Sequence, residues 1–427
     1  MQNNTDVIQP IAAIRTSHEI IAKLGFLVFL FFAFFGTSIP FQEEISEIDD
    51  ITTSNIVNQL LYSILFLTSL YSLTPVRLQL FQLIKREKWL SLFLLWCLLS
   101  ILWSEFPFVS FKRLFQTITA VLVSVSVLLH TKSFPELLRF FKWILLPYVI
   151  LSMASIIFIP GAIDLKFMTW RGLSATKNTF AQVCLICIII WFNVFRQEDF
   201  FRQKITAFGL TLLSIILLIG SQSGTSLITF SALTGVSLVI LFFNGLFGSF
   251  TLSRFLVAIV LISGAAIVTS TIVFAPDVLT RLPYLIGKDI TFSGRVDLWI
   301  DILEEVKKHP ILGCGYAGFW VVDNIDLLIL FEKYVWLPNQ AHSGYVDILN
   351  ETGIIGLALL AMMLIVYYKN LFRLREPHFW KWFVLAAILI NLQETTFFRT
   401  NNLTGNIFIF AYLALYVRLL KENNPSF

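Results

Sequence analysis

Several basic residues and one histidine lie where they can do chemistry, at the ends of long apolar runs. They are Lys112, Arg113, Arg171, Lys177, Arg295, His342 and Arg399. Arginine presents forked N–H donors that match phosphate oxygens, and lysine adds a point charge. Histidine exchanges a proton near neutral pH. These residue types predict a site for a phosphate-bearing substrate, with His342 as a general base.

Three polar residues accompany this set. Asn178 and Glu394 each lie within a few residues of a cation in the sequence, and both can support it. Glu351 follows His342 by nine residues, which on a helix places it about 180° around the axis, so we expect a structural role for it. A single cation at a span end is more often an interfacial anchor, and a lone histidine more often a structural residue. The gathering of several such residues at one depth favours the chemical interpretation.

The segments that carry these residues show no pattern for a metal ion or another cofactor. They contain no D-x-D motif and no cluster of histidines and carboxylates with ligand spacing. If the phosphate-bearing group is a diphosphate that acts as the leaving group, it gains negative charge in the transition state. Either a metal ion or cationic side chains can stabilise that charge. We therefore expect the cations to do so, without metal and without cofactor.

The composition indicates what holds these residues in place. Hydrophobic residues make up 57% of the 427 residues and charged residues only 14%, whereas soluble domains are about half apolar and a quarter charged. A helix needs about 20 apolar residues to cross a bilayer. Candidate runs are 24–40, 56–74, 89–104, 112–131, 141–160, 174–195, 205–220, 225–246, 254–275, 343–368, 379–396 and 402–420. We predict an all-α polytopic membrane protein of about twelve transmembrane helices that forms one domain over residues 1–427.

The distribution of basic residues predicts the orientation of these helices, because cytoplasmic loops carry an excess of lysine and arginine. With the N-terminus inside, 19 of the 31 basic residues fall in inner segments and six in short outer segments. We therefore expect both termini in the cytoplasm and the cations and histidine at the outer boundary of the membrane. The mild net charge of +4 gives no indication of a nucleic-acid partner.

One extracytoplasmic segment, residues 276–342, is long enough to carry structure of its own. Within it, residues 294–308 have the pattern of an amphipathic helix, with Ser293 as N-cap. The predicted apolar stripe consists of Val296, Trp299, Ile300, Leu303 and Val306. Such a helix can lie on the outer leaflet, roof a cavity between the spans, or pack on the bundle as an ordinary loop helix.

Three motifs lie in and after this segment, at 293–299 (SGRVDLW), 309–316 (HPILGCGY) and 342–356 (HSGYVDILNETGIIG). They resemble the signature region of the O-antigen ligase and polymerase superfamily. Two upstream motifs, at 177–181 (KNTFA) and 221–226 (SQSGTS), are similar to elements of its exopolysaccharide-polymerase branch. Many members of the family have a basic residue where this chain has Gly224, which puts in doubt a phosphate-binding role for that turn.

The resemblance implies an inverting, metal-independent glycosyltransferase of the bacterial inner membrane, with an undecaprenyl-diphosphate-linked oligosaccharide as donor. It implies that His342 is essential and that Arg295 and Arg171 contact the diphosphate. We expect Lys177, Lys112, Arg113 and Arg399 to take part in binding it.

The expected acceptor is a hydroxyl group of a second glycan, so that polymerisation of repeat units is the leading interpretation and a chain-length regulator an expected partner. Ligation to a lipid A-core or a protein is the alternative. A lipid-linked glycan flippase or other transporter is the alternative from another class, and it predicts charges along a route to both sides of the membrane.

Overall fold

A computed structural model of the chain describes residues 5–36, 56–131, 133–164, 168–247, 295–334, 337–374, 379–399 and 402–423. Its elements are α1 (Thr5–Phe35), α3 (Ile56–Leu73), η1 (Thr74–Val76), α4 (Arg77–Arg86), α5 (Lys88–Ser100), α6 (Pro107–His130), α7 (Phe134–Phe158), η2 (Pro160–Ala162), β1 (Ile163–Asp164), β2 (Thr169–Trp170), α8 (Lys177–Gln197), α9 (Phe201–Ser221), α10 (Gly224–Phe247), α13 (Arg295–Lys308), α14 (Ile325–Lys333), α15 (Gly344–Leu371), α16 (Lys381–Ile390) and α17 (Leu403–Asn423). The strands form one short antiparallel pair in which Ile163 faces Trp170.

The predicted all-α membrane architecture is confirmed. Among the described residues, eight helices are long and apolar enough to cross a membrane, and three shorter apolar helices accompany them. These helices coincide with the predicted runs except for 254–275, which lies outside the described residues. The count of twelve spans therefore stays a prediction.

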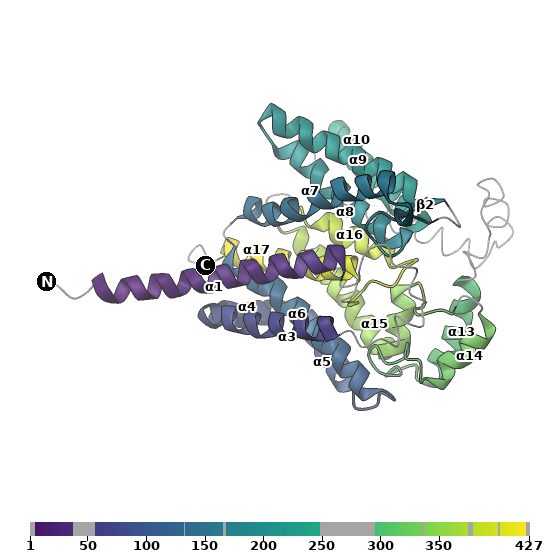
Figure 1. Cartoon of the computed structure of the whole chain (residues 1–427). Helices are drawn as coiled ribbons and strands as arrows, with labels where there is room; N and C mark the ends of the chain where they lie inside the picture. The colour runs from purple at the N-terminus through teal and green to yellow at the C-terminus, as the bar shows by residue number, and fades with distance from the viewer. Residues whose placement is uncertain are drawn as a thin grey trace.

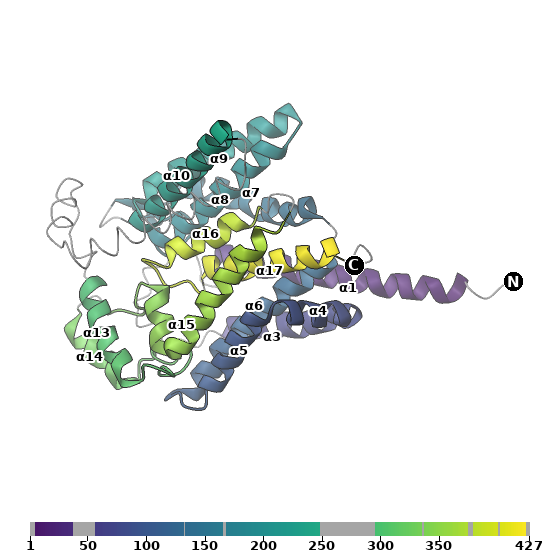
Figure 2. The same ribbon diagram turned by 180° about the vertical axis from the view of Figure 1, so that it is seen from behind.

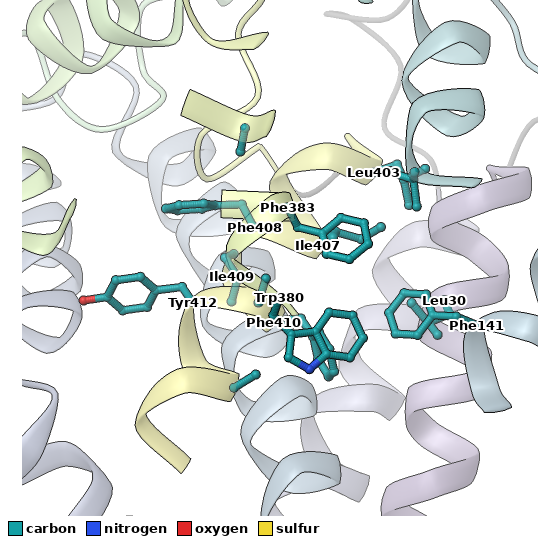
Figure 3. Packing of buried hydrophobic residues seen from close by; sticks show 14 of the residues in the cluster. Leu30, Phe141, Trp380, Phe383, Leu403, Ile407, Phe408, Ile409, Phe410 and Tyr412 are labelled. Carbon is teal, nitrogen blue, oxygen red and sulfur yellow. The ribbon is translucent and has the colours of Figure 1, made fainter. Parts of the chain in front are cut away.

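Helix α17 is the central helix of the bundle and is buried along nearly its whole length. Phe410 on this helix stacks on Phe26 of α1 at 5.0 Å and meets Trp380 edge to face at 4.9 Å. Figure 3 shows Phe410, Trp380 and Phe141 gathered in this core. Aromatic side chains bury large areas with few rotatable bonds, so they hold the helices in one arrangement.

The outer surface of the bundle is apolar, as a lipid-facing surface requires. On α1, Ile20, Leu24, Val28 and Phe31 recur at helical spacing and are each at least 42% exposed. Because lipid cannot pair with backbone polar groups, a helix that satisfies its own hydrogen bonds is the element suited to such a surface.

The bundle has two distinct ends. Helix α1 begins and α17 ends toward one of them, whereas α13, α14 and β2 lie at the other (Figure 1). The view from behind shows the same separation of α13 and α14 from the two chain ends (Figure 2). The helix predicted at 294–308 is present as α13, and Ser293 lies outside the described residues.

The predicted apolar stripe of α13 was partly wrong. The buried side chains are Leu298, Ile302 and Val306, while Ile300 and Leu303 are 55% and 42% exposed. Polar contacts explain this rotation of the helix, because Arg295 binds Glu394 and the indole Nε1 of Trp299 donates to the carbonyl of Ala341 at 2.7 Å. Two polar anchors therefore decide which face is buried.

Helix α15 is bent at Gly353, whose φ of +66° favours glycine. A side chain there would overlap the carbonyl of Ile311. The bend frees carbonyls of α15, and other segments use them: Cys314 N donates to Asn350 O at 3.0 Å, Gly315 N donates to Glu351 O at 2.9 Å, and Trp96 Nε1 donates to Thr352 O at 2.9 Å. The segment that follows α13 is thereby fixed to α15.

Candidate active site

Arg295, His342 and Glu394 come together from three separate segments at the end of the bundle that carries α13. Arg295 opens α13, His342 precedes α15, and Glu394 follows α16. The Nη2 of Arg295 lies 3.0 Å from Glu394 Oε1, and the Nδ1 of His342 lies 3.3 Å from Glu394 Oε2. The guanidinium also donates to the carbonyl of Gln393. One carboxylate therefore holds a cation and an imidazole side by side.

A polar chain extends this cluster to α8 and to the start of α10. Asn178 Nδ2 donates to Glu394 Oε1 at 3.0 Å, and the hydroxyl of Ser223 donates to Asn178 Oδ1 at 3.0 Å. Thr225 donates to Gln393 Oε1 at 3.2 Å. The two upstream motifs thus reach the same site as the late ones.

Glu394 is 5% exposed, and its environment keeps it ionised. Burial alone raises a carboxyl pKa, but the hydrogen bond from His342 and the charge of Arg295 outweigh it, so the pKa of Glu394 lies below its ordinary value. A carboxylate accepts hydrogen bonds only. We therefore assign the imidazole proton to Nδ1, which leaves the lone pair of the neutral ring on Nε2.

The backbone around His342 is held by hydrogen bonds on both sides. His342 has a φ of +50°, a strained value for a residue with a side chain. After it, Gly344 N donates to Asn391 O at 3.0 Å and Glu394 O at 3.2 Å. A side chain at position 344 would overlap Asn391. These contacts fix the imidazole relative to the turn that carries Glu394.

Asp347, which is 1% exposed, connects the two segments that carry His342 and Glu394. It accepts hydrogen bonds from Ala341 N at 3.3 Å and from Thr395 Oγ1 at 2.5 Å. The indole Nε1 of Trp320 also donates to Asp347, at 2.8 Å. Ala341 precedes His342 and Thr395 follows Glu394, so Asp347 acts on both through the chain.

Arg399 and Glu351 form a second charged cluster, joined to the first at Asp347. Nη2 of Arg399 lies 2.5 Å from Glu351 Oε1 and 3.7 Å from Asp347 Oδ2. Burial disfavours the charged guanidinium, but the carboxylates of Glu351 and Asp347 outweigh it and raise the pKa of Arg399. Glu351 also accepts from Ala317 N at 3.0 Å. The charge of Arg399 is therefore compensated within the protein.

The remaining cations lie on other segments, and two of them bind backbone carbonyls. Arg113 on α6 donates to the carbonyls of Ala317 at 2.6 Å and Trp320 at 3.1 Å, and half-buried Lys112 precedes it. Arg171 donates to Gly161 O at 2.7 Å in the segment before α8. Lys177 is the first residue of α8, directly before Asn178. Lys177 is thus adjacent in sequence to Asn178, whose side chain binds Glu394.

The described part of the chain has no group of three or more His, Cys, Asp and Glu side chains arranged to hold a metal ion.

Residues 209–361 match a family described as O-antigen ligase. The chain is also 27% identical, over 313 residues, to the exopolysaccharide production protein ExoQ of Rhizobium meliloti, and the alignment covers 70% of each chain. Both matches support the similarity of this chain to the O-antigen ligase and polymerase superfamily. The resemblance seen in the motifs is thereby confirmed.

The superfamily match contains Arg295, His342 and Glu351, whereas Asn178 and Glu394 lie outside it. The structure brings Glu394 to the matched region through the hydrogen bond from Arg295, and Asn178 donates to the same carboxylate. The candidate site is thus built from the matched region and from segments on both sides of it.

Asp347 belongs to the 342–356 motif, but no role was expected for it from the sequence. Asp347 lies between apolar residues in a membrane helix, where a carboxylate is costly and marks a functional or paired residue. That signal could have found it. Asn391 carries no such signal, although its side-chain oxygen accepts from Thr396 N at 2.8 Å and Phe397 N at 2.9 Å and so shapes the turn around Glu394.

Proposed function

We propose that this protein transfers a glycan from undecaprenyl diphosphate to a hydroxyl group of a second glycan, and so polymerises repeat units. One observation carries the proposal: the two oxygens of Glu394 hold Arg295 and His342 side by side. This supplies a cation for a departing diphosphate and a base for an acceptor hydroxyl in one place.

In the proposed reaction, the acceptor oxygen attacks the anomeric carbon of the donor sugar from the face opposite the diphosphate. The bond between that carbon and the phosphate oxygen breaks, and undecaprenyl diphosphate leaves with the electron pair, so the anomeric configuration inverts. The hydroxyl proton passes to Nε2 of His342. Glu394 orients the ring and stabilises the imidazolium, as the carboxylate does in a catalytic triad.

Arg295 and Lys177 are the cations we assign to the diphosphate. Two nitrogens of Arg295 bind Gln393 and Glu394, and a guanidinium has five N–H donors, so the same group can also bind phosphate oxygens. Lys177 opens α8, whose N-terminal dipole favours an anion. Arg171 and Lys112 are assigned to the outer parts of the lipid-linked substrates, while Arg113 and Arg399 hold the loop around Ala317.

We assign the end of the bundle with α13 and α14 to the extracytoplasmic side and both termini to the cytoplasm. The separation of these ends supports the assignment, together with the basic residues of the inner segments. Reporter fusions after Asn324 and at the C-terminus should report opposite compartments. The same compartment for both would overturn the topology.

Polymerisation is tested with purified protein in lipid nanodiscs supplied only with lipid-linked repeat units. We expect a ladder of longer lipid-linked chains, and no ladder with the His342→Ala variant. A flippase would be favoured instead if the folded wild-type protein leaves the substrate chemically unchanged and moves this lipid-linked substrate across the bilayer of a proteoliposome.

Ligation is the second candidate, because the matching family is described as O-antigen ligase. The acceptor separates the two reactions, since both use the same donor. If the protein makes no ladder but transfers glycan once a lipid A-core or a protein acceptor is added, it is a ligase.

A further inference from the structure

A cavity of about 210 Å³ lies between α5, α13, α14 and α15 at the end of the bundle that carries α13. It is lined by Trp103 and Glu105 after α5, Glu305 on α13, Asp326 on α14 and Asn350 on α15. The volume is below the roughly 300–1,000 Å³ of sites for drug-sized ligands, so it suits one sugar ring rather than a whole oligosaccharide. None of these residues belongs to the Arg295–His342–Glu394 cluster.

Two buried donors in the wall of this cavity have no acceptor. Asn350 is only 3% exposed, and its Nδ2 makes no hydrogen bond. The indole Nε1 of Trp103 is likewise buried without a partner. A buried donor left unsatisfied costs about 1–3 kcal/mol, so native proteins rarely keep one without a reason. A ligand with hydroxyl or carbonyl oxygens supplies the missing acceptors.

The charges of the cavity select against a phosphate. Lys308 is bound by Glu305 at 2.6 Å and by Asp326 at 2.8 Å, so its charge is compensated. Glu105 adds a further carboxylate on the exposed side. Carboxylates repel phosphates and accept hydrogen bonds from hydroxyl groups. With the flat indole of Trp103 beside them, they fit a hydroxylated, uncharged ring.

The cavity lies at a distance from the transfer site that suits one glycan chain. Arg295 begins α13 and Lys308 ends it, and 13 helical steps of 1.5 Å separate them by about 20 Å. A sugar ring in the cavity is therefore too remote to react and close enough to belong to a glycan bound at His342.

We propose that this cavity is a saccharide subsite that binds a ring of the glycan substrate remote from the reacting bond, and so selects the repeat unit. The proposal rests on the proposed glycan transfer, and it adds a recognition site formed by Trp103, Asn350 and Glu105.

The probe is an oligosaccharide without lipid or diphosphate, released by mild acid from the surface polysaccharide of the strain that encodes this chain. Its binding to purified protein in nanodiscs is followed by saturation-transfer NMR. We expect wild-type protein to bind it and maltotriose not to compete. Trp103→Phe and Asn350→Ala should each raise Kd about tenfold, as expected for a lost hydrogen bond in a desolvated site.

Two further variants guard against misfolding. Glu105→Gln changes an exposed residue without changing its shape and should also weaken binding. Trp143→Phe is the matched control for Trp103→Phe, because Trp143 on α7 is 72% exposed. This control should leave Kd unchanged.

The outcomes separate this subsite from the proposed function. If the variants bind the probe as wild type does, or if the wild type does not bind it while still making the ladder, the subsite is wrong and the transferase stands. If the wild type binds the probe through Trp103 and Glu105 but transfers no glycan to any acceptor, the subsite stands and the proposed reaction is wrong.

Discussion

Nη2 of Arg399 lies 2.5 Å from Oε1 of Glu351, and the Glu351 side chain is 1% exposed. The other oxygen of this carboxylate accepts from the backbone of Ala317. Arg399, which the sequence suggested as a ligand of the diphosphate, is thus bound by a buried carboxylate. These contacts indicate that Arg399 and Glu351 together hold the segment after α13 against α15.

We predict that Arg399→Ala lowers stability rather than donor affinity. Removal of one partner from a buried ion pair costs about 3–5 kcal/mol, because the other charge stays buried and unpaired. The apparent Tm of the protein in detergent should fall, and Arg399→Ala with Glu351→Gln should recover part of the loss. The control Lys307→Ala breaks an exposed pair with Glu304 and should cost at most about 1 kcal/mol. A normal Tm with a raised requirement for donor would instead assign Arg399 to the diphosphate.

Asp347→Asn should slow transfer while the protein stays folded. The amide oxygen of asparagine can still accept the hydrogen bond from Trp320, but its amide nitrogen cannot accept the one from Thr395. The turn that carries Glu394 therefore loses a contact. Misplacement of reacting groups by about 1 Å costs on the order of a hundredfold in rate. We expect kcat to fall and KM for the donor to change little.

The matched control for this variant is Asp323→Asn, the same change at an exposed position of the preceding loop. If both variants turn over like wild type, Asp347 has no positioning role.

His342→Ala should abolish most of the transfer, and Glu394→Gln should have a smaller effect. Loss of a general base typically costs about a hundred- to ten-thousandfold. Glutamine keeps an acceptor for one partner but loses the charge that stabilises the imidazolium. The initial rate of ladder formation, measured with an equal amount of monodisperse protein, tests both variants. Turnover near wild type in His342→Ala would leave the histidine with a structural role only.

Acid should remove the stabilisation that Glu394 provides. The pKa of Glu394 in the folded protein is below its ordinary value, so its contribution is complete above about pH 4.3, the usual pKa of glutamate. The contribution is lost as the pH falls through the lower folded value. The difference in apparent Tm between wild type and Glu394→Gln should therefore persist at about pH 5 and shrink below about pH 4. A difference that disappears already near pH 6 would contradict this assignment.

Arg295 should be needed for its fork of donors as well as its charge. We expect Arg295→Ala to lose transfer and Arg295→Lys to recover only part of it, because lysine cannot bind Glu394 and a phosphate with the same planar geometry. Transfer by wild-type membranes should also survive treatment with EDTA. Loss of activity that a divalent metal restores would show that a metal ion stabilises the leaving group.

The sequence predicted the elements better than their contacts. The membrane helices follow from composition and length, and α13 follows from its period and its boundaries. Its buried face did not follow, because the bond of Arg295 to Glu394 joins residues 99 positions apart and decides the rotation of the helix. Contacts across such separations leave no local pattern in a single sequence.

The same reason explains the site. Arg295 and His342 were found from residue type and motif, since both types carry chemistry that few others can perform. Glu394 was expected only in support, and Asp347 was missed, because their importance comes from what they touch. The bend at Gly353 was also missed, since one glycine in an apolar run has several structural uses.

The bend at Gly353 has a consequence for biogenesis. Carbonyl groups released from a helix cannot stay unpaired in lipid, so we expect α15 to enter the membrane as a straight helix. In the folded protein, those carbonyls accept from the N–H groups of Cys314 and Gly315 and from the indole of Trp96. We therefore expect the bend to act as an assembly checkpoint, at which α15 adopts its mature form only after the segment that follows α13 has docked.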